Sequence, residues 1–305
     1  MRDVFAESVP EVINLPTANG NRPVKVNTVR GRNVVKLGDL AVVKIGLQSG
    51  DNPRFYRAAK GVTGGAAKGG YKEVDPKLTL KEEMLSLVSL DEQKNGIQVN
   101  DPSSDRYFLP LDKAAASDIA SGLLPMFWRP IEFYIDWSRS AVETYKNLSG
   151  ARFQGSEYYF RKGISFSNTG IYSPTYRLSH GGVFDQTGSC IFSEVLEPEV
   201  LLGILASTLL KYLAKSFINH GAHAQLDDLP IVLPSKDEAA LIQSKVREII
   251  NEQKINHVFD YRDKLAELDE IIFDMYGLES DERAEINVWY QRHYPRLFDS
   301  SAPEA

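Results

Sequence analysis

The sequence contains a single cysteine, Cys190, among 305 residues. One thiol excludes an intrachain disulfide and a cysteine-based zinc cluster, and it fits a reducing compartment. No run of residues approaches the roughly 20 apolar residues that a membrane-spanning helix needs. Residues 1–16 also lack the basic and apolar regions of a signal peptide. We therefore expect a cytoplasmic protein with no membrane partner.

The usual signatures of catalysis are missing as well. The chain has no Gly-x-Ser-x-Gly elbow, and "GGAAKGG" (64–70) lacks the Ser or Thr and the helix that follow a phosphate-binding loop. His220 and His223 have no third ligand at a diagnostic spacing. Asp75-Pro76-Lys77 has the spacing of a nuclease motif but precedes an expected helix. We predict no catalytic residue and no metal site in this chain.

Charge is unevenly distributed along the sequence. The net charge is -6, yet residues 1–192 carry 24 Lys and Arg against 20 Asp and Glu (+4), and residues 193–305 carry 11 against 21 (-10). Two parts of opposite charge suggest two different surfaces. The range 144–183 contains a single acid, Glu157, and five cations: Lys146, Arg152, Arg161, Lys162 and Arg177. A phosphate backbone favours such a region, although a solvated basic face without a partner has the same composition.

The first part of the chain has β-like patterns. Residues 23–47 are rich in Val, Ile and Leu and predict strands. Residues 49–71 predict either a long glycine-rich loop or two loops that flank a short strand. Residues 77–93 predict a helix whose apolar set is Leu78, Leu80, Met84, Leu85 and Leu87. Residues 107–192 again favour strands, with one helix at 138–148.

After Phe192 the pattern becomes helical. Residues 198–218 predict a buried helix, and a short extended segment follows at 230–234. Ser235 and Glu238 predict a capping box that opens a polar helix. Further helices are expected near 261–276, ending at Gly277, and at 281–293. The expected class is α+β, with a β-rich domain over 1–192 and a helical region over 193–305.

Asn52-Pro53-Arg54-Phe55 differs by one residue from the Asn-Pro-Pro-Phe loop with which amino-group DNA methyltransferases hold a flipped adenine. Arg54 replaces the second proline, whose rigidity presents a carbonyl to the adenine amino group. The glycine-rich turn and the acidic residue that hold the cofactor are missing too. The stretch therefore predicts no methyltransferase active site and no cofactor in this chain.

A longer pattern carries a resemblance. "GLQSGDNPRFYR" (46–57) resembles the segment that opens the target-recognition region of Type IIG-like adenine-specific DNA methyltransferases, the Taq-type C-terminal specificity domain. Four further stretches agree in order, at 127–137, 151–192, 201–234 and 268–297. The departures are Ser49, where the family often has Thr, and "HGAHAQLDDLPI", which approximates the family's "FQVGDIKRLPI".

The resemblance implies a division of labour. In the family an upstream domain binds S-adenosylmethionine and methylates adenine, and the region found here chooses which adenine. It implies a recognition module that is separately encoded, cut from a longer protein or made as a fragment, with the cofactor held by the partner. The trailing helices resemble those of Type I specificity subunits, which space the reading domain and dock it to the methyltransferase.

The residues supply the chemistry that such recognition requires. Reading a duplex needs side chains that reach base edges, together with basic groups that contact phosphates. We expect phosphate contacts from Arg161, Lys162 and Arg177, and base contacts from Ser167, Asn168, Thr169 and Tyr172. A second set of DNA contacts is expected on the glycine-rich loop, from Asn52, Arg54, Arg57 and Lys68. Two alternatives stay open: Asp51 and Asn52 form only an Asx-type turn, and Tyr158, Tyr159 and Phe160 fill core.

The sequence thus predicts a module that recognises double-stranded DNA for an adenine methyltransferase domain or subunit, in a restriction-modification or phage-defence system. It is expected to be no enzyme on its own. One rival is an active adenine methyltransferase or nuclease of unfamiliar layout. Another is a protein that assembles or inhibits such a system without touching DNA.

Overall fold

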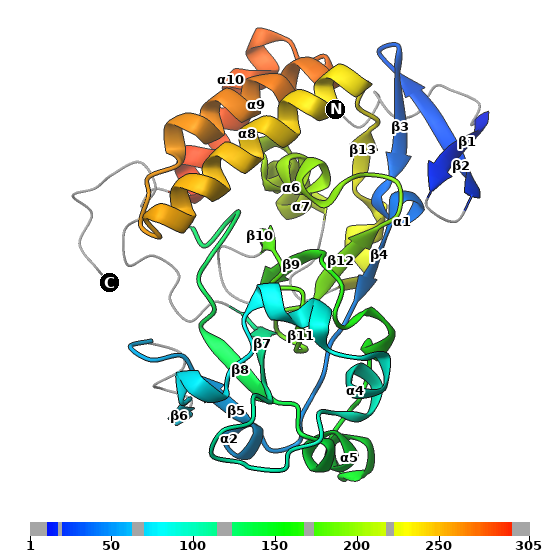
Figure 1. Ribbon diagram of the computed structural model, residues 1–305. Helices are drawn as coiled ribbons and strands as arrows, with labels where there is room; N and C mark the ends of the chain where they lie inside the picture. The colour runs from blue at the N-terminus through cyan, green and yellow to red at the C-terminus, as the bar shows by residue number, and fades with distance from the viewer. Residues whose placement is uncertain are drawn as a thin grey trace.

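The chain has an α+β fold with several open sheets (Figure 1). A computed structural model describes residues 11–17, 20–62, 70–114, 124–167, 174–217 and 223–294. Within these ranges every helix is too short or too polar to span a lipid bilayer.

One antiparallel sheet joins three strands near the N-terminus to one strand from the last third of the chain. Its strand order is β1-β2-β3-β13, with bounds β1 (Glu11–Thr17), β2 (Gly20–Val29), β3 (Arg32–Lys36) and β13 (Pro230–Val232). Ile231 of β13 pairs with Val35 of β3. The predicted strands around 23–47 and the extended segment after Pro230 are confirmed, except that Leu37–Leu40 forms a short helix, α1.

Two further sheets carry the middle of the chain. The order β10-β9-β12-β4 is antiparallel, with β4 (Ala41–Lys44), β9 (Ile164–Ser167), β10 (Thr175–Leu178) and β12 (Cys190–Ser193). The order β11-β7-β8-β5-β6 is mixed, with β5 (Tyr56–Ala58), β6 (Lys72–Glu73), β7 (Phe108–Asp112), β8 (Phe133–Asp136) and β11 (Val183–Phe184). This confirms the β-like character of 107–192.

Short helices connect these strands. They are α2 (Asn52–Phe55), α4 (Leu90–Asn95), α5 (Arg139–Asn147) and the 3-10 turns η2 (Pro76–Leu78), η3 (Glu82–Leu87) and η4 (Ser156–Tyr158). The predicted helix at 138–148 is confirmed. The single helix predicted over 77–93 is wrong, because a capping box of Ser89 and Glu92 starts a new helix at Leu90. Leu80 and Leu85 are buried in the core at 7% exposed each, whereas Leu87 is 76% exposed, so the apolar residues of this stretch do not form one helical face.

The last third of the chain is helical, with α6 (Pro198–Ala206), α7 (Thr208–Phe217), η5 (His223–Asp228), α8 (Lys236–Ile255), α9 (Arg262–Tyr276) and α10 (Ser280–His293). In Figure 1, α8, α9 and α10 form a layer at one end, and α6 and α7 lie between this layer and the sheets. The predicted capping box of Ser235 and Glu238 is confirmed, and so is the left-handed C-cap at Gly277, with φ 64°. The predicted helix 198–218 is two helices with a break at Ser207.

Two hydrophobic cores hold the structure together. One combines the strands before Ala41 with β9, β10 and the C-terminal helices. The other surrounds Trp137, which is fully buried and lies 5.8 to 6.0 Å from the rings of Phe153, Tyr159 and Phe160. The cores therefore do not separate at residue 192, where the composition changes, because the N-terminal strands pack on the C-terminal helices.

Ion pairs connect the same two parts. They are Arg30 with Glu282 at 2.8 Å, Arg32 with Glu238 at 2.6 Å and Lys36 with Asp228 at 2.7 Å. Such partly exposed pairs contribute up to about 1 kcal/mol each. Some of the opposite charges of the two parts therefore neutralise each other within the protein. The charge difference along the sequence is thus weaker evidence for two separate binding surfaces.

Asp269 of α9 provides a test of the helical packing. The carboxylate accepts hydrogen bonds from the backbone N–H of Thr208, at 2.8 Å, and from its hydroxyl, and so caps α7. Burial raises the pKa of Asp269 to about 7, although the bonds from Thr208 act in the opposite direction. The folded form then binds a proton that the unfolded form has lost, so this carboxyl contributes stability below about pH 4 that disappears as the pH rises through about 7.

We expect Asp269→Asn to remove that dependence. The free energy of unfolding is measured in urea for both proteins at several pH values. Between pH 4 and pH 7 the wild type should lose about 2 to 4 kcal/mol relative to Asp269→Asn. A difference between the two proteins that does not change over this range would contradict the assigned environment of Asp269.

Candidate nucleic-acid interface

The two segments expected to contact DNA are joined by backbone hydrogen bonds. The N–H of Leu47 donates to the carbonyl of Phe184 at 2.9 Å, and the N–H of Gln186 donates to Leu47 at 3.1 Å. Gln48 and Arg152 exchange two bonds, at 3.0 and 2.8 Å. Residues about one hundred positions apart in the sequence therefore form one local structure.

Gly46 is required for this approach. A Cβ atom there would lie 2.0 Å from the carbonyl oxygen of Phe184, a backbone atom with little freedom to move. At Gly155, which has φ +71°, a Cβ atom would similarly lie 2.7 Å from the carbonyl oxygen of Ile45. The glycines that open each segment are explained by close packing of backbones.

Residues Asn52–Phe55 form one helical turn, α2. Asp51 is its N-cap and accepts a hydrogen bond from the N–H of Arg54 at 3.2 Å. The hydroxyl of Ser49 donates to the side-chain oxygen of Asn52 at 2.6 Å. Phe55 is buried. The local-turn alternative is thus confirmed for Asp51, and Asn52 has its oxygen occupied within the loop.

Arg54 and Arg57 lie close to each other beside this turn. The guanidinium of Arg54 is exposed and sits 4.8 Å from the ring centroid of Phe55. Arg57 is half-buried, donates to the carbonyl of Arg54 at 2.9 Å and lies 5.4 Å from the ring of Phe108. Arg54 is therefore the better placed of the two to reach a ligand.

A second basic group surrounds Tyr158. The Nζ of Lys44 lies 4.7 Å from the ring centroid of Tyr158, and the guanidinium of Arg161 lies 5.0 Å from it. Arg161 is exposed, and Lys44 also pairs with Glu157 at 3.2 Å. We refer to Lys44, Arg161 and Tyr158 as the Tyr158 cluster. The sequence analysis did not identify Lys44 as a candidate. The one indication in the sequence is its position two residues before the segment 46–57.

Lys162 is exposed beside an acidic site. It lies next to Gly181, where a Cβ atom would be 3.3 Å from the Lys162 Cγ atom. Glu82 Oε1 is 2.6 Å from Nδ1 of His180. Burial raises the pKa of Glu82, but the hydrogen bond with His180 and the charges of His180, Lys162 and Lys254 together hold it below its ordinary value. An ionised Glu82 reduces the attraction of Lys162 for phosphate.

Arg177 is buried, which corrects its predicted role. It is 4% exposed, and its Nη2 donates to the carbonyl of Lys113 at 2.6 Å. Asp112, 2% exposed, accepts from the backbone N–H of His180 at 2.9 Å. Burial raises the pKa of Asp112, opposed by the charges of His180 and Arg177. A phosphate contact is incompatible with this position, and Arg177 instead holds the end of β7.

We expect Arg177→Met to lower the free energy of unfolding by about 2 to 3 kcal/mol, because Asp112 loses a buried cation. The salt dependence of DNA binding should not change. By contrast, Arg161→Ala should reduce the slope of log Kd against log salt by about 1. Urea unfolding and binding titrations at several salt concentrations measure both quantities, and a reduced slope for Arg177→Met would restore it as a phosphate contact.

Of the four predicted base readers, Ser167 lies within the described residues. Ser167 ends β9 and is 7% exposed, so its position does not fit a base contact. Asn168, Thr169 and Tyr172 lie outside the described residues, as does Lys68. Tyr159 is buried and its hydroxyl donates to the carbonyl of Gln154 at 2.7 Å, while Tyr158 and Phe160 pack partly buried against the second core.

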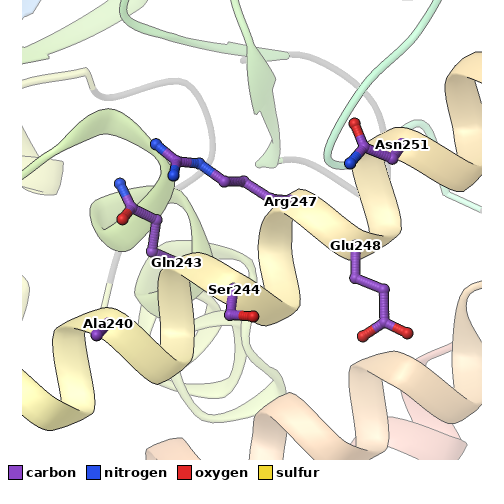
Figure 2. A pocket seen from close by; sticks show the side chains of 6 residues that line it. All are labelled: Ala240, Gln243, Ser244, Arg247, Glu248 and Asn251. Carbon is purple, nitrogen blue, oxygen red and sulfur yellow. The ribbon is translucent and has the colours of Figure 1, made fainter.

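A shallow groove of about 410 Å³ lies elsewhere, along the outer side of α8, and is shown in Figure 2. Six residues line it: Ala240, Gln243, Ser244, Arg247, Glu248 and Asn251. Arg247 and Glu248 point away from each other in Figure 2 and are paired with Glu199 and Lys264. In the parts of the chain that the structure describes, no three His, Cys, Asp or Glu side chains gather as a metal site.

Comparison with models of known protein families and with curated proteins gave no match to this chain. The residues and their geometry therefore carry the functional interpretation.

Proposed function

We propose that this chain is a sequence-specific module for duplex DNA that directs an adenine-N6 DNA methyltransferase of a restriction-modification or phage-defence system in the cytoplasm. The observation that carries the proposal is the backbone pairing of 46–48 with Arg152 and with 184–186. It joins the two segments whose residue types suit DNA reading. S-adenosylmethionine would be held by the methyltransferase partner.

The cations outside the two cores support a phosphate contact. Arg54 stands beside α2, and the Tyr158 cluster presents Lys44 and Arg161 on an aromatic ring. Cations that lie against an aromatic ring have restricted conformations, so less side-chain entropy is lost when they bind a phosphate backbone. Base contacts would come from Arg54 and from the predicted readers Asn168, Thr169 and Tyr172.

The helical layer is the proposed side for the protein partner. Its exposed acids would repel phosphate, although several pair with Lys or Arg of the same layer, such as Glu270 and Asp274 with Arg283. A surface of alternating, internally paired charges suits a protein partner better than a nucleic acid.

Titration of a labelled duplex of about 40 base pairs and mixed sequence tests the proposal. We expect binding at 50 mM salt, and a slope of log Kd against log salt of about 3, as for three to four phosphate contacts. Absence of binding at this salt concentration would favour the assembly or inhibitor protein. Tritium transfer from S-adenosylmethionine to the duplex by the chain alone would establish the enzyme instead.

A further inference from the structure

Glu157 is the single acid in the basic range 144–183. It lies in η4, and its Oε1 atom is 3.2 Å from Nζ of Lys44, an amine that already belongs to the Tyr158 cluster. The side chains of Lys44 and Glu157 are 32% and 60% exposed. Packing therefore does not explain a carboxylate next to a candidate phosphate contact.

The fold brings this carboxylate to Lys44. Lys44 ends β4, and the next residue, Ile45, packs so closely on Gly155 that a Cβ atom there would lie 2.7 Å from the Ile45 carbonyl oxygen. Gly155 is the N-cap of η4, and Glu157 follows in the first turn. Because both side chains start from backbones in close contact, their pairing costs less conformational entropy than an ordinary surface ion pair.

The carboxyl of Glu157 is ionised at neutral pH. A hydrogen bond from its own backbone N–H lowers its pKa, and the hydrogen bond and charge of Lys44 act in the same direction, against the opposing effect of burial. Lys44, Arg161 and Glu157 together therefore carry one net positive charge instead of two. A DNA phosphate that approaches Lys44 must displace this carboxylate and is repelled by it.

We propose that Glu157 is an autoinhibitory contact: it holds Lys44 in an ion pair that a DNA phosphate has to break, and so reduces the sequence-independent affinity of the chain for duplex DNA. The inference rests on the proposed function, because it assigns a regulator to the same interface. Sequence-independent binding comes essentially from phosphate contacts. A lower affinity for random duplex leaves more of the chain free to find its motif.

Glu157→Gln in the full chain keeps the shape of the side chain and removes its charge. We expect its Kd for a labelled mixed-sequence duplex at 50 mM salt to be about five- to tenfold lower than that of the wild type. The unfolding midpoint should not change, because the side chain is exposed. Glu248→Gln is the matched control, since it removes a carboxylate that is paired with Lys264 in the helical layer. Its Kd should stay within about twofold of the wild-type value.

Lys44→Ala tests whether Glu157 acts through Lys44. When Lys44 is already absent, Glu157→Gln should improve binding by less than about twofold, because the ion pair no longer exists. A gain that persists at its full size without Lys44 would overturn the proposal. Weaker or unchanged binding by Glu157→Gln alone would overturn it too, and so would an equal gain for Glu248→Gln.

The same titrations separate this proposal from the proposed function. Binding by the wild type with no gain for Glu157→Gln overturns the autoinhibitory contact and leaves the proposed function in place. Absence of binding by both proteins overturns the proposed function and the autoinhibitory contact together. Binding by Glu157→Gln alone supports both.

Discussion

Gly46→Ala is expected to abolish the folded protein. The added methyl carbon would stand 2.0 Å from the carbonyl oxygen of Phe184 and 2.5 Å from its carbonyl carbon. Relieving the clash requires separating two backbones joined by the bond from Leu47 to Phe184. We expect a loss of more than about 4 kcal/mol, a large part of the total stability of an ordinary domain. Circular dichroism should show no cooperative thermal transition.

Gly61→Ala is the control for this substitution. Gly61 has φ +78°, so alanine is strained there, but no atom lies within 4 Å of its Cβ position. The expected cost is about 1 kcal/mol, with a normal transition at a slightly lower temperature. Equal unfolding midpoints for the two variants would contradict the packing of the two candidate segments against each other.

The double substitution Lys44→Ala and Arg161→Ala is expected to give the largest loss of DNA affinity. Both cations lie against Tyr158, and neither side chain is in a core. Removing two phosphate contacts should reduce the slope of log Kd against log salt by about 2, and weaken binding about tenfold at 0.15 M salt. Thermal unfolding should change little, because exposed cation–π contacts contribute about 0.5 to 1 kcal/mol each.

Lys236→Ala with Arg292→Ala is the matched pair, since it removes two exposed cations from the helical layer. This control variant has the same net charge as the Lys44→Ala and Arg161→Ala variant. The slope of log Kd against log salt should stay at its wild-type value. If both double variants weaken binding equally, the effect comes from total charge and the Tyr158 cluster is not a DNA contact.

Elements set by neighbouring residues could be predicted from the sequence. The capping box of Ser235 and Glu238 and the C-cap at Gly277 depend on residues within one or two turns. The break at Ser207 combines a local cap, since the Ser207 hydroxyl accepts from the N–H of Leu210 at 3.3 Å, with a distant one, since Asp269 of α9 accepts from the N–H of Thr208. No local pattern reveals a cap that comes from another helix.

In the candidate site, too, some features depend on neighbouring residues and others on residues distant in the sequence. The turn at Asp51 and the exposed position of Arg54 follow from local sequence. Burial of Arg177 and the stacking of Lys44 on Tyr158 depend on strands distant in sequence. Cations on a β-like stretch can therefore be predicted, but whether each one faces solvent is decided by the assembled sheets.

Selection from a randomised duplex pool tests the central claim most directly. The wild-type chain is incubated with the pool at about 0.15 M salt, and the retained DNA is sequenced after several rounds. We predict that one short motif is enriched, and that Arg54→Ala weakens binding to this motif by about 1 to 3 kcal/mol while binding to random DNA changes less. Retention of the pool without enrichment of any motif would contradict sequence-specific recognition.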